Sequence, residues 1–117
     1  MTKCAIDLHE LLLRVENDRA LMQDLLSLFK EEFPQRYHAL REAVESRDAS
    51  RVISEAHALK GMLSNLAAGE AAEASAELER LGRNKEIAKF PESFANFERI
   101  AKELSRQVAA YMAEVSG

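Results

Sequence analysis

A histidine, a lysine and a glycine lie close together in the segment His57-Ala58-Leu59-Lys60-Gly61. On an α-helix, residues three and four positions apart share a face, so Lys60 and Gly61 fall beside His57. A neutral imidazole is a nucleophile near neutral pH, and a lysine beside it can pair with an anionic group. The spacing therefore predicts an exposed nucleophile that serves an anionic group and a docking partner.

His57 falls off the apolar stripe of its segment, and the residues that surround it on the exposed side are all small. They are Ser50, Ser54, Ala58, Gly61 and Ser64. In a chain with 31% charged residues, a solvated helix face would more often carry long charged side chains. We therefore expect this face to leave room for another protein's active site to close over His57.

Gly61 has two possible explanations, because a glycine inside a helix costs about 1 kcal/mol relative to alanine. The glycine can leave space for a partner to reach His57, or it can allow a second helix to cross closely. Because Gly61 points away from the apolar stripe, the first explanation is favoured. The other two histidines, His9 and His38, lack a lysine three residues on and a glycine four residues on. We interpret these two as incidental or structural.

The composition indicates one globular domain over residues 1–117, since 47% of its residues are hydrophobic. A net charge of -4 argues against nucleic acid or an anionic membrane as partner. The only cysteine, Cys4, cannot form an internal disulfide and makes a thiolate metal site improbable. No apolar run approaches 18 residues. We expect a cytoplasmic protein without metal and without membrane contact.

The first half of the chain reads as helices with clear start signals. Asp7 begins a short helix that extends to Val15, in a capping-box pattern completed by a glutamate. Asn17 or Asp18 begins a second helix, which Pro34 stops or kinks because proline removes a backbone donor. The segment after Pro34 either forms a third helix or continues the second as one kinked rod.

Two further helices follow in the middle of the chain. Asp48 is a good N-cap for the helix that bears His57, which we expect to reach about Ala67, with Gly69 near its C-terminal end. The next helix, 70–81, is rich in alanine and should pack closely on a neighbour, and the segment Gly82-Arg83-Asn84-Lys85 ends it.

The last helix has the most regular pattern, with apolar residues at alternating spacings of four and three. They are Phe90, Phe94, Phe97, Ala101, Leu104, Val108, Tyr111 and Val115. A helix with such a stripe cannot bury it alone, and short connections favour antiparallel neighbours. The prediction is an all-α protein: an antiparallel four-helix bundle with a short N-terminal helix and a kinked second/third helix.

The motif around His57, followed by Asn65-Leu66 and by Leu81-Gly82-Arg83, resembles the signature of histidine-containing phosphotransfer (HPt) domains. The resemblance covers nearly the full chain. It implies a phosphorelay in which His57 accepts a phosphoryl group from the aspartyl phosphate of a receiver domain and passes it to a response-regulator aspartate. Lys60 would stabilise the phosphoryl group, while Gly61 and its small neighbours would keep the approach open. The chain departs from the family at Ala67-Ala68, where a Gly-Ala pair is common.

Glu79, on the helix that faces His57, falls where related domains place a polar residue near the imidazole. It could accept a hydrogen bond from the ring and set its tautomer. The alternative is a solvated glutamate beside Arg80 and Arg83.

The sequence does not favour an autonomous enzyme. Glycines occur only at positions 61, 69, 82 and 117, so the chain has no Gly-rich phosphate cradle and no sign of its own ATP-binding site. We expect no cofactor, with Mg²⁺ only in the partner receiver domain. Two alternatives stay open: a non-catalytic helical interaction module, or a phosphoacceptor domain excised from a larger hybrid or chemotaxis-type histidine kinase.

Overall fold

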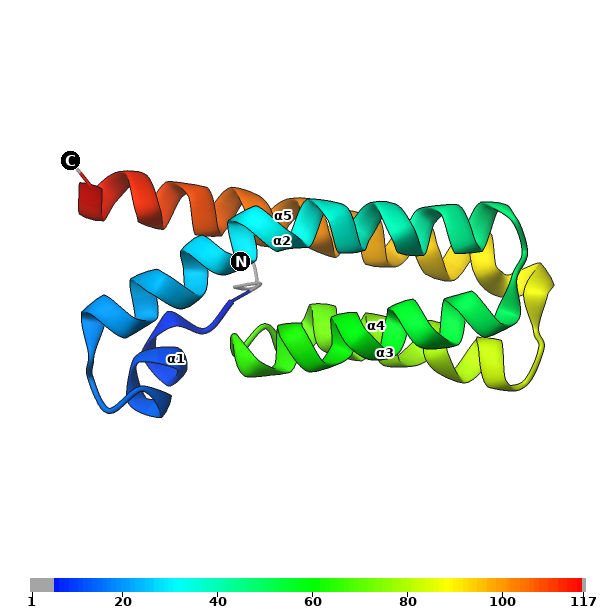
Figure 1. Ribbon diagram of the computed structural model, residues 1–117, viewed down its shortest axis with the longest axis horizontal. Helices are drawn as coiled ribbons and strands as arrows, with labels where there is room; N and C mark the ends of the chain where they lie inside the picture. Colours follow the sequence, from blue (N-terminus) through cyan, green and yellow to red (C-terminus); the bar gives the residue numbers. More distant parts are fainter. Residues whose placement is uncertain (1–5, 117) are drawn as a thin grey trace.

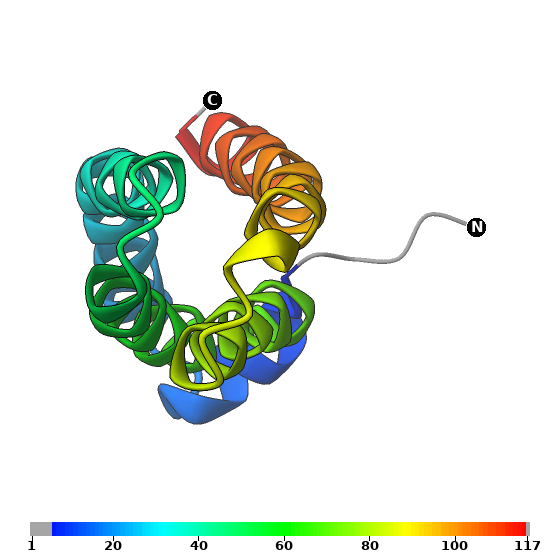
Figure 2. The same ribbon diagram turned by 90° about the vertical axis from the view of Figure 1, so that its right-hand side faces the viewer.

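The computed structural model describes residues 6–116, and its regular elements in this range are all helical. They are α1 (Leu8–Arg14), α2 (Arg19–Glu45), α3 (Ala49–Asn65), α4 (Gly69–Arg83), the short 3-10 helix η1 (Ile87–Lys89) and α5 (Phe90–Ser116). Helices α2 to α5 run antiparallel to their chain neighbours and form a bundle (Figures 1 and 2). The predicted fold class is confirmed. Cys4 lies outside the described residues.

Aspartate side chains begin α1, α2 and α3, as the sequence predicts. Asp7, Asp18 and Asp48 each accept a hydrogen bond from the backbone N–H three residues on, at 2.9, 3.0 and 3.2 Å. Such a bond satisfies one of the backbone donors that the first turn leaves without a partner. Of the two candidates for α2, Asp18 is the cap, while Asn17 adopts a left-handed backbone with φ 64°.

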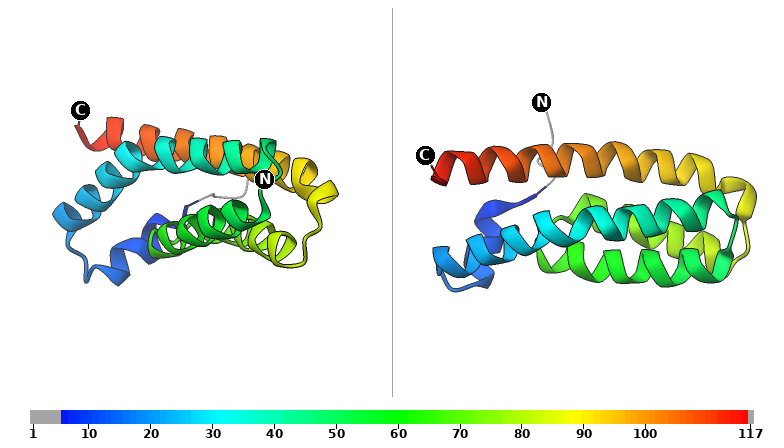
Figure 3. Two further views of the ribbon diagram at one scale, coloured as in Figure 1. Left: turned by 45° about the vertical axis from the view of Figure 1, so that its right-hand side comes forward. Right: turned by 45° about the horizontal axis from the view of Figure 1, so that its top comes forward.

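Pro34 lies inside α2 and does not end it, so the kinked-rod alternative is the observed one. The helix changes direction along its length (Figure 3). Aromatic packing supports the segment around the proline, because the rings of Phe33 and Tyr37 lie 6.5 and 6.3 Å from that of Phe97 in α5. Both residues therefore hold α2 against the same partner helix.

The connection between α3 and α4 spans residues 66–68, one residue more than the sequence predicted. Helix α3 ends at Asn65, and Gly69 is the first residue of α4, so our placement of Gly69 at the end of α3 is wrong. The left-handed position of this turn is occupied by Ala67, with φ 56°. The turn closes through a bond from the Ala68 N–H to the Leu63 carbonyl at 3.0 Å.

Gly82 is part of α4 and sets how closely α4 approaches α3. A Cβ atom at this position would lie 2.8 Å from Ile53 Cγ1 and 3.2 Å from the Ala49 carbonyl oxygen, so only a glycine fits without movement. The expectation that α4 packs closely on a neighbour is confirmed, whereas the helix extends to Arg83, two residues beyond the expected last residue Leu81.

Helix α1 lies against the end of the α3–α4 hairpin where the two helices are joined (Figure 1). The Asp7 N–H donates to the Ala67 carbonyl at 3.1 Å. The Arg14 guanidinium donates to the Ser64 carbonyl, in the last turn of α3, at 2.6 Å. These bonds satisfy carbonyl groups at a helix end and tie α1 to the helix that bears His57.

Helix α5 buries the predicted stripe from Phe90 to Val108, and Tyr111 is half-buried. The side chain of Val115, the last residue of that stripe, lies outside the described residues. Within residues 6–116, no helix has the length and apolar character needed to cross a membrane.

Candidate functional site

His57 lies in the middle of α3 on the side turned away from the bundle core, and 65% of its side chain is exposed. The core side of the same helix carries Val52, Ala56, Leu59 and Leu63, all fully buried. Because those residues fix the rotation of α3, the imidazole is presented to solvent next to α4.

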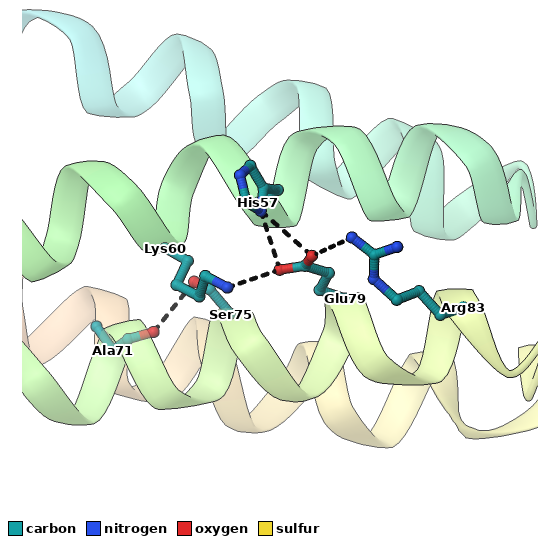
Figure 4. Close-up of polar contacts among 6 residues, drawn as sticks. All are labelled: His57, Lys60, Ala71, Ser75, Glu79 and Arg83. Carbon is teal, nitrogen blue, oxygen red and sulfur yellow. Dashed lines mark hydrogen bonds and ion pairs between the residues drawn. The ribbon is translucent and has the colours of Figure 1, made fainter.

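Glu79 of α4 holds one edge of the imidazole (Figure 4). Its carboxylate oxygens Oε1 and Oε2 lie 3.3 and 3.2 Å from His57 Nδ1. Only 8% of the Glu79 side chain is exposed. Sequence reasoning left two interpretations open, and the burial of Glu79 shows that the solvated one is wrong. Arg80 instead pairs with Glu77 on the exposed side of α4.

Two cations bind the same carboxylate from opposite sides. Lys60 Nζ lies 3.1 Å from Glu79 Oε1, and an Arg83 guanidinium nitrogen lies 2.7 Å from Glu79 Oε2 (Figure 4). Lys60 reaches across from α3, whereas Arg83 lies one turn beyond Glu79 on α4. Each carboxylate oxygen therefore faces both a cation and the imidazole.

These contacts fix the charge of Glu79. The Arg83 hydrogen bond, helped by Lys60 and His57, lowers the pKa of Glu79 from 4.5 to about 2 against the opposing effect of burial. A carboxylate can only accept hydrogen bonds, so the contact with His57 places the proton on Nδ1. In the neutral imidazole, the lone pair is then on Nε2, the nitrogen that Glu79 does not contact.

The surface around His57 carries only small residues, and we call it the open face. It consists of the exposed residues Ser50, Ser54, Gly61 and Ser64, with half-buried Ala58 beside them. Among residues 6–116, a Cβ atom at Gly61 would meet nothing within 4 Å beyond its chain neighbours and the adjacent backbone of its own helix. The close helix crossing that could have explained this glycine is therefore not observed.

Of the residues that the sequence singled out, the structure brings His57, Lys60 and Glu79 together, with the open face around them. Sequence reasoning assigned no role to Arg83, although its spacing of four residues from Glu79 on one helix was a signal. His9 and His38 are exposed on α1 and α2 and take no part in the cluster.

The chain thus folds as a helical bundle that presents on an outer face a histidine whose ring contacts a carboxylate. The family model described as Hpt domain matches residues 24–115, and the chain belongs to this family. Domains of this family carry phosphoryl groups in phosphorelays and interact with receiver domains of two-component systems.

A solved structure shows the same fold. It is the crystal structure of histidine-containing phosphotransfer protein B (HptB) from Pseudomonas aeruginosa PAO1, which is 24% identical and superposes with a TM-score of 0.87. The match covers 97% of this chain and 98% of that one. A comparison with curated proteins gave no match.

Proposed function

We propose that His57 is the phosphoryl-accepting residue of this Hpt domain, and that Nε2 is the atom that reacts. The observation that carries the proposal is the contact of both Glu79 oxygens with Nδ1, at 3.3 and 3.2 Å, on an imidazole whose side chain is 65% exposed. The contact leaves the Nε2 lone pair free, and the exposure lets a second protein reach it.

The donor is the aspartyl phosphate of a receiver domain, and the final acceptor is the aspartate of another receiver domain. Nε2 forms a bond to phosphorus while the bond from phosphorus to the aspartyl oxygen breaks, and the aspartate leaves as a carboxylate. The proton stays on Nδ1, so the phosphorylated ring is positively charged. Glu79 lies where it balances that charge. The reverse displacement, by a second aspartate, returns His57 to its neutral form.

Lys60 is the residue that we expect to stabilise the phosphoryl group. Its side chain is 38% exposed, and its ammonium group binds the same Glu79 carboxylate that contacts the imidazole. An ammonium on a flexible stem can turn from the carboxylate to an arriving phosphoryl oxygen. The open face serves docking, since Gly61, Ser54 and their small neighbours present no long side chain to the incoming receiver domain.

We infer that the domain uses no cofactor and no ATP of its own. The phosphoryl group arrives already activated, and the Mg²⁺ that such transfers use belongs to the receiver domain. The net charge of -4 disfavours nucleic acid and anionic membranes as partners, and the proposed setting is the cytoplasm.

The test is transfer of radiolabelled phosphate from a panel of phosphorylated receiver domains to the wild type, His57→Gln, His9→Gln and His38→Gln. We expect His57→Gln to accept no label while keeping the wild-type helicity by circular dichroism, because His57 makes no core contact. The other two variants should accept label normally. Label on His57→Gln would overturn the site, and a wild type that accepts from no receiver would favour a helical interaction module.

A further inference from the structure

The contact between Glu79 and His57 has an electrostatic cost for the proposed reaction. A buried carboxylate beside an imidazole favours its protonated form, and a protonated imidazole has no lone pair on Nε2. Glu79 by itself would therefore orient His57 and at the same time reduce the fraction that can react. Another group must therefore offset the negative charge of Glu79 without breaking its contact with His57 Nδ1.

Among the described residues, the ion pairs show which charged groups face His57. Helix α3 contributes Lys60, and helix α4 contributes Glu79 and Arg83. The charged residues between α2 and α3, among them Glu31, Arg36 and Glu55, line a separate groove on the opposite side of α3. With neutral His57, the cluster of Lys60, Glu79 and Arg83 carries one net positive charge.

We propose that Arg83 is a positioning residue for His57: it holds the Glu79 carboxylate against Nδ1 and, together with Lys60, offsets the negative charge that this carboxylate places beside the imidazole. The proposal rests on the assignment of His57 as the phosphoryl acceptor. Glu79 determines which ring nitrogen carries the lone pair. The two cations influence the fraction of molecules in which that lone pair is unprotonated.

Arg83 is suited to this task by its geometry. It makes the shortest contact in the cluster, 2.7 Å to Glu79 Oε2, and it lies on the same helix as Glu79, so the pair keeps its geometry when a partner docks. Lys60 is able to leave Glu79 for a phosphoryl group, after which Arg83 alone holds the carboxylate in place.

The consequence is a change in pH dependence when Arg83 loses its charge. In Arg83→Gln the protonated imidazole is favoured relative to the wild type, so acceptance should fall in weakly acidic buffer and recover as pH rises. A unit charge a few ångströms away at a wet surface corresponds to about 0.5 pH unit. In Arg83→Lys the charge remains and the midpoint should stay near that of the wild type.

The experiment measures the NMR titration of the His57 ring from pH 5 to 9 without any phosphate donor, with His57→Gln identifying its signal. Arg80→Gln is the matched control, because Arg80 carries the same charge on α4 but pairs with Glu77 and Glu86. We expect the midpoint to rise by about 0.5 pH unit in Arg83→Gln, to change little in Arg80→Gln, and to return in Arg83→Lys.

The rate of phosphoryl acceptance is then measured over the same pH range, and its midpoint should move with the NMR midpoint. An unchanged NMR midpoint in Arg83→Gln, or an equal shift in Arg80→Gln, would overturn the proposal even if His57 is the acceptor. A shift in the NMR titration without any phosphoryl acceptance by the wild type would contradict the proposed function and leave the electrostatic role of Arg83 supported.

Discussion

Gly61 and Gly82 lie on the same helical hairpin, and their surroundings are opposite. Gly61 belongs to the open face of α3, where, in the part of the chain that the structure describes, an added Cβ atom meets nothing within 4 Å beyond the adjacent turn of its own helix. Gly82 belongs to α4 at a contact that we call the closed joint, where the same atom would approach Ile53 Cγ1 to 2.8 Å and the Ala49 carbonyl oxygen to 3.2 Å.

The comparison teaches that a glycine inside a helix has no single meaning. Gly61, inside α3, weakens its helix by about 1 kcal/mol relative to alanine, and Gly82, in the last turn of α4, weakens its helix by less. At the closed joint the compensation is internal, because two helices approach closely enough to place Glu79 against His57. At the open face, no contact among the described residues compensates for the cost of the glycine. We therefore expect the compensation to come from contact with a partner protein.

The largest expected effect is at the closed joint. Gly82→Val should lower the free energy of unfolding by about 2–3 kcal/mol, since its side chain would overlap a stiff β-branched residue and a backbone carbonyl. Urea unfolding measures the change. The matched control, Gly61→Val, should change stability by less than about 1 kcal/mol. Equal losses in both variants would remove the distinction between the two glycines.

The next effect concerns the charge beside the open face. Lys60→Ala should slow phosphoryl acceptance about tenfold or more while the fold stays intact, because a charge-assisted contact contributes about 1.5–3 kcal/mol. The lifetime of the phosphorylated form should change less than the rate of acceptance. Lys85→Ala, which removes an exposed lysine beyond the end of α4, is the control. An unchanged acceptance rate at low and high salt would show that Lys60 is only a surface charge.

A smaller and opposite pair of effects is expected at Gly61. Gly61→Ala should raise the free energy of unfolding by about 1 kcal/mol, and Gly61→Gln by about 0.5 kcal/mol, because both residues favour helix more than glycine does. Gly61→Gln should nevertheless bind receiver domains weakly and transfer slowly. Thermal unfolding and label transfer measure the two quantities. A variant that melts lower, or that transfers at the wild-type rate, would contradict a docking role for the open face.

The last effect, spread over several pH units, is the acid dependence of Glu79, which the closed joint keeps buried. Its pKa of about 2 in the folded protein is below the ordinary 4.5, so its charge stabilises the fold above about pH 4.5 and stops doing so as pH falls toward 2. The stability difference between the wild type and Glu79→Gln should therefore shrink between pH 5 and pH 2. Exposed Glu73 provides the control, and a difference that is constant with pH would contradict the lowered pKa.

The sequence predicted those parts of the fold that depend on local chemistry. The caps at Asp7, Asp18 and Asp48, the buried stripe of α5 and the exposure of His57 follow from hydrogen bonding and helical periodicity alone. Each of these is decided within one helix or its first turn. That is the range over which a pattern in one sequence is informative.

The errors and omissions concern how two helices meet. Gly69 was placed on the wrong helix because Ala67 adopts the left-handed conformation for which a glycine is the usual signal. The roles of Arg83 and Gly82 depend on the rotation and register of α4 against α3, which tertiary packing determines. For the same reason, the sequence did not decide between the two interpretations of Glu79, and its burial in the structure did.

The turn of three residues between α3 and α4 has a consequence for how the protein folds. His57, Lys60, Glu79 and Arg83 all lie within residues 57–83, so their cluster assembles when one helical hairpin closes. Contacts between segments so near in sequence carry a small entropy cost of loop closure, and chains dominated by them fold in microseconds to milliseconds. The cluster around His57 is therefore among the structures that can form early, before the distant ends of α2 and α5 meet, and its geometry is set largely by a local event.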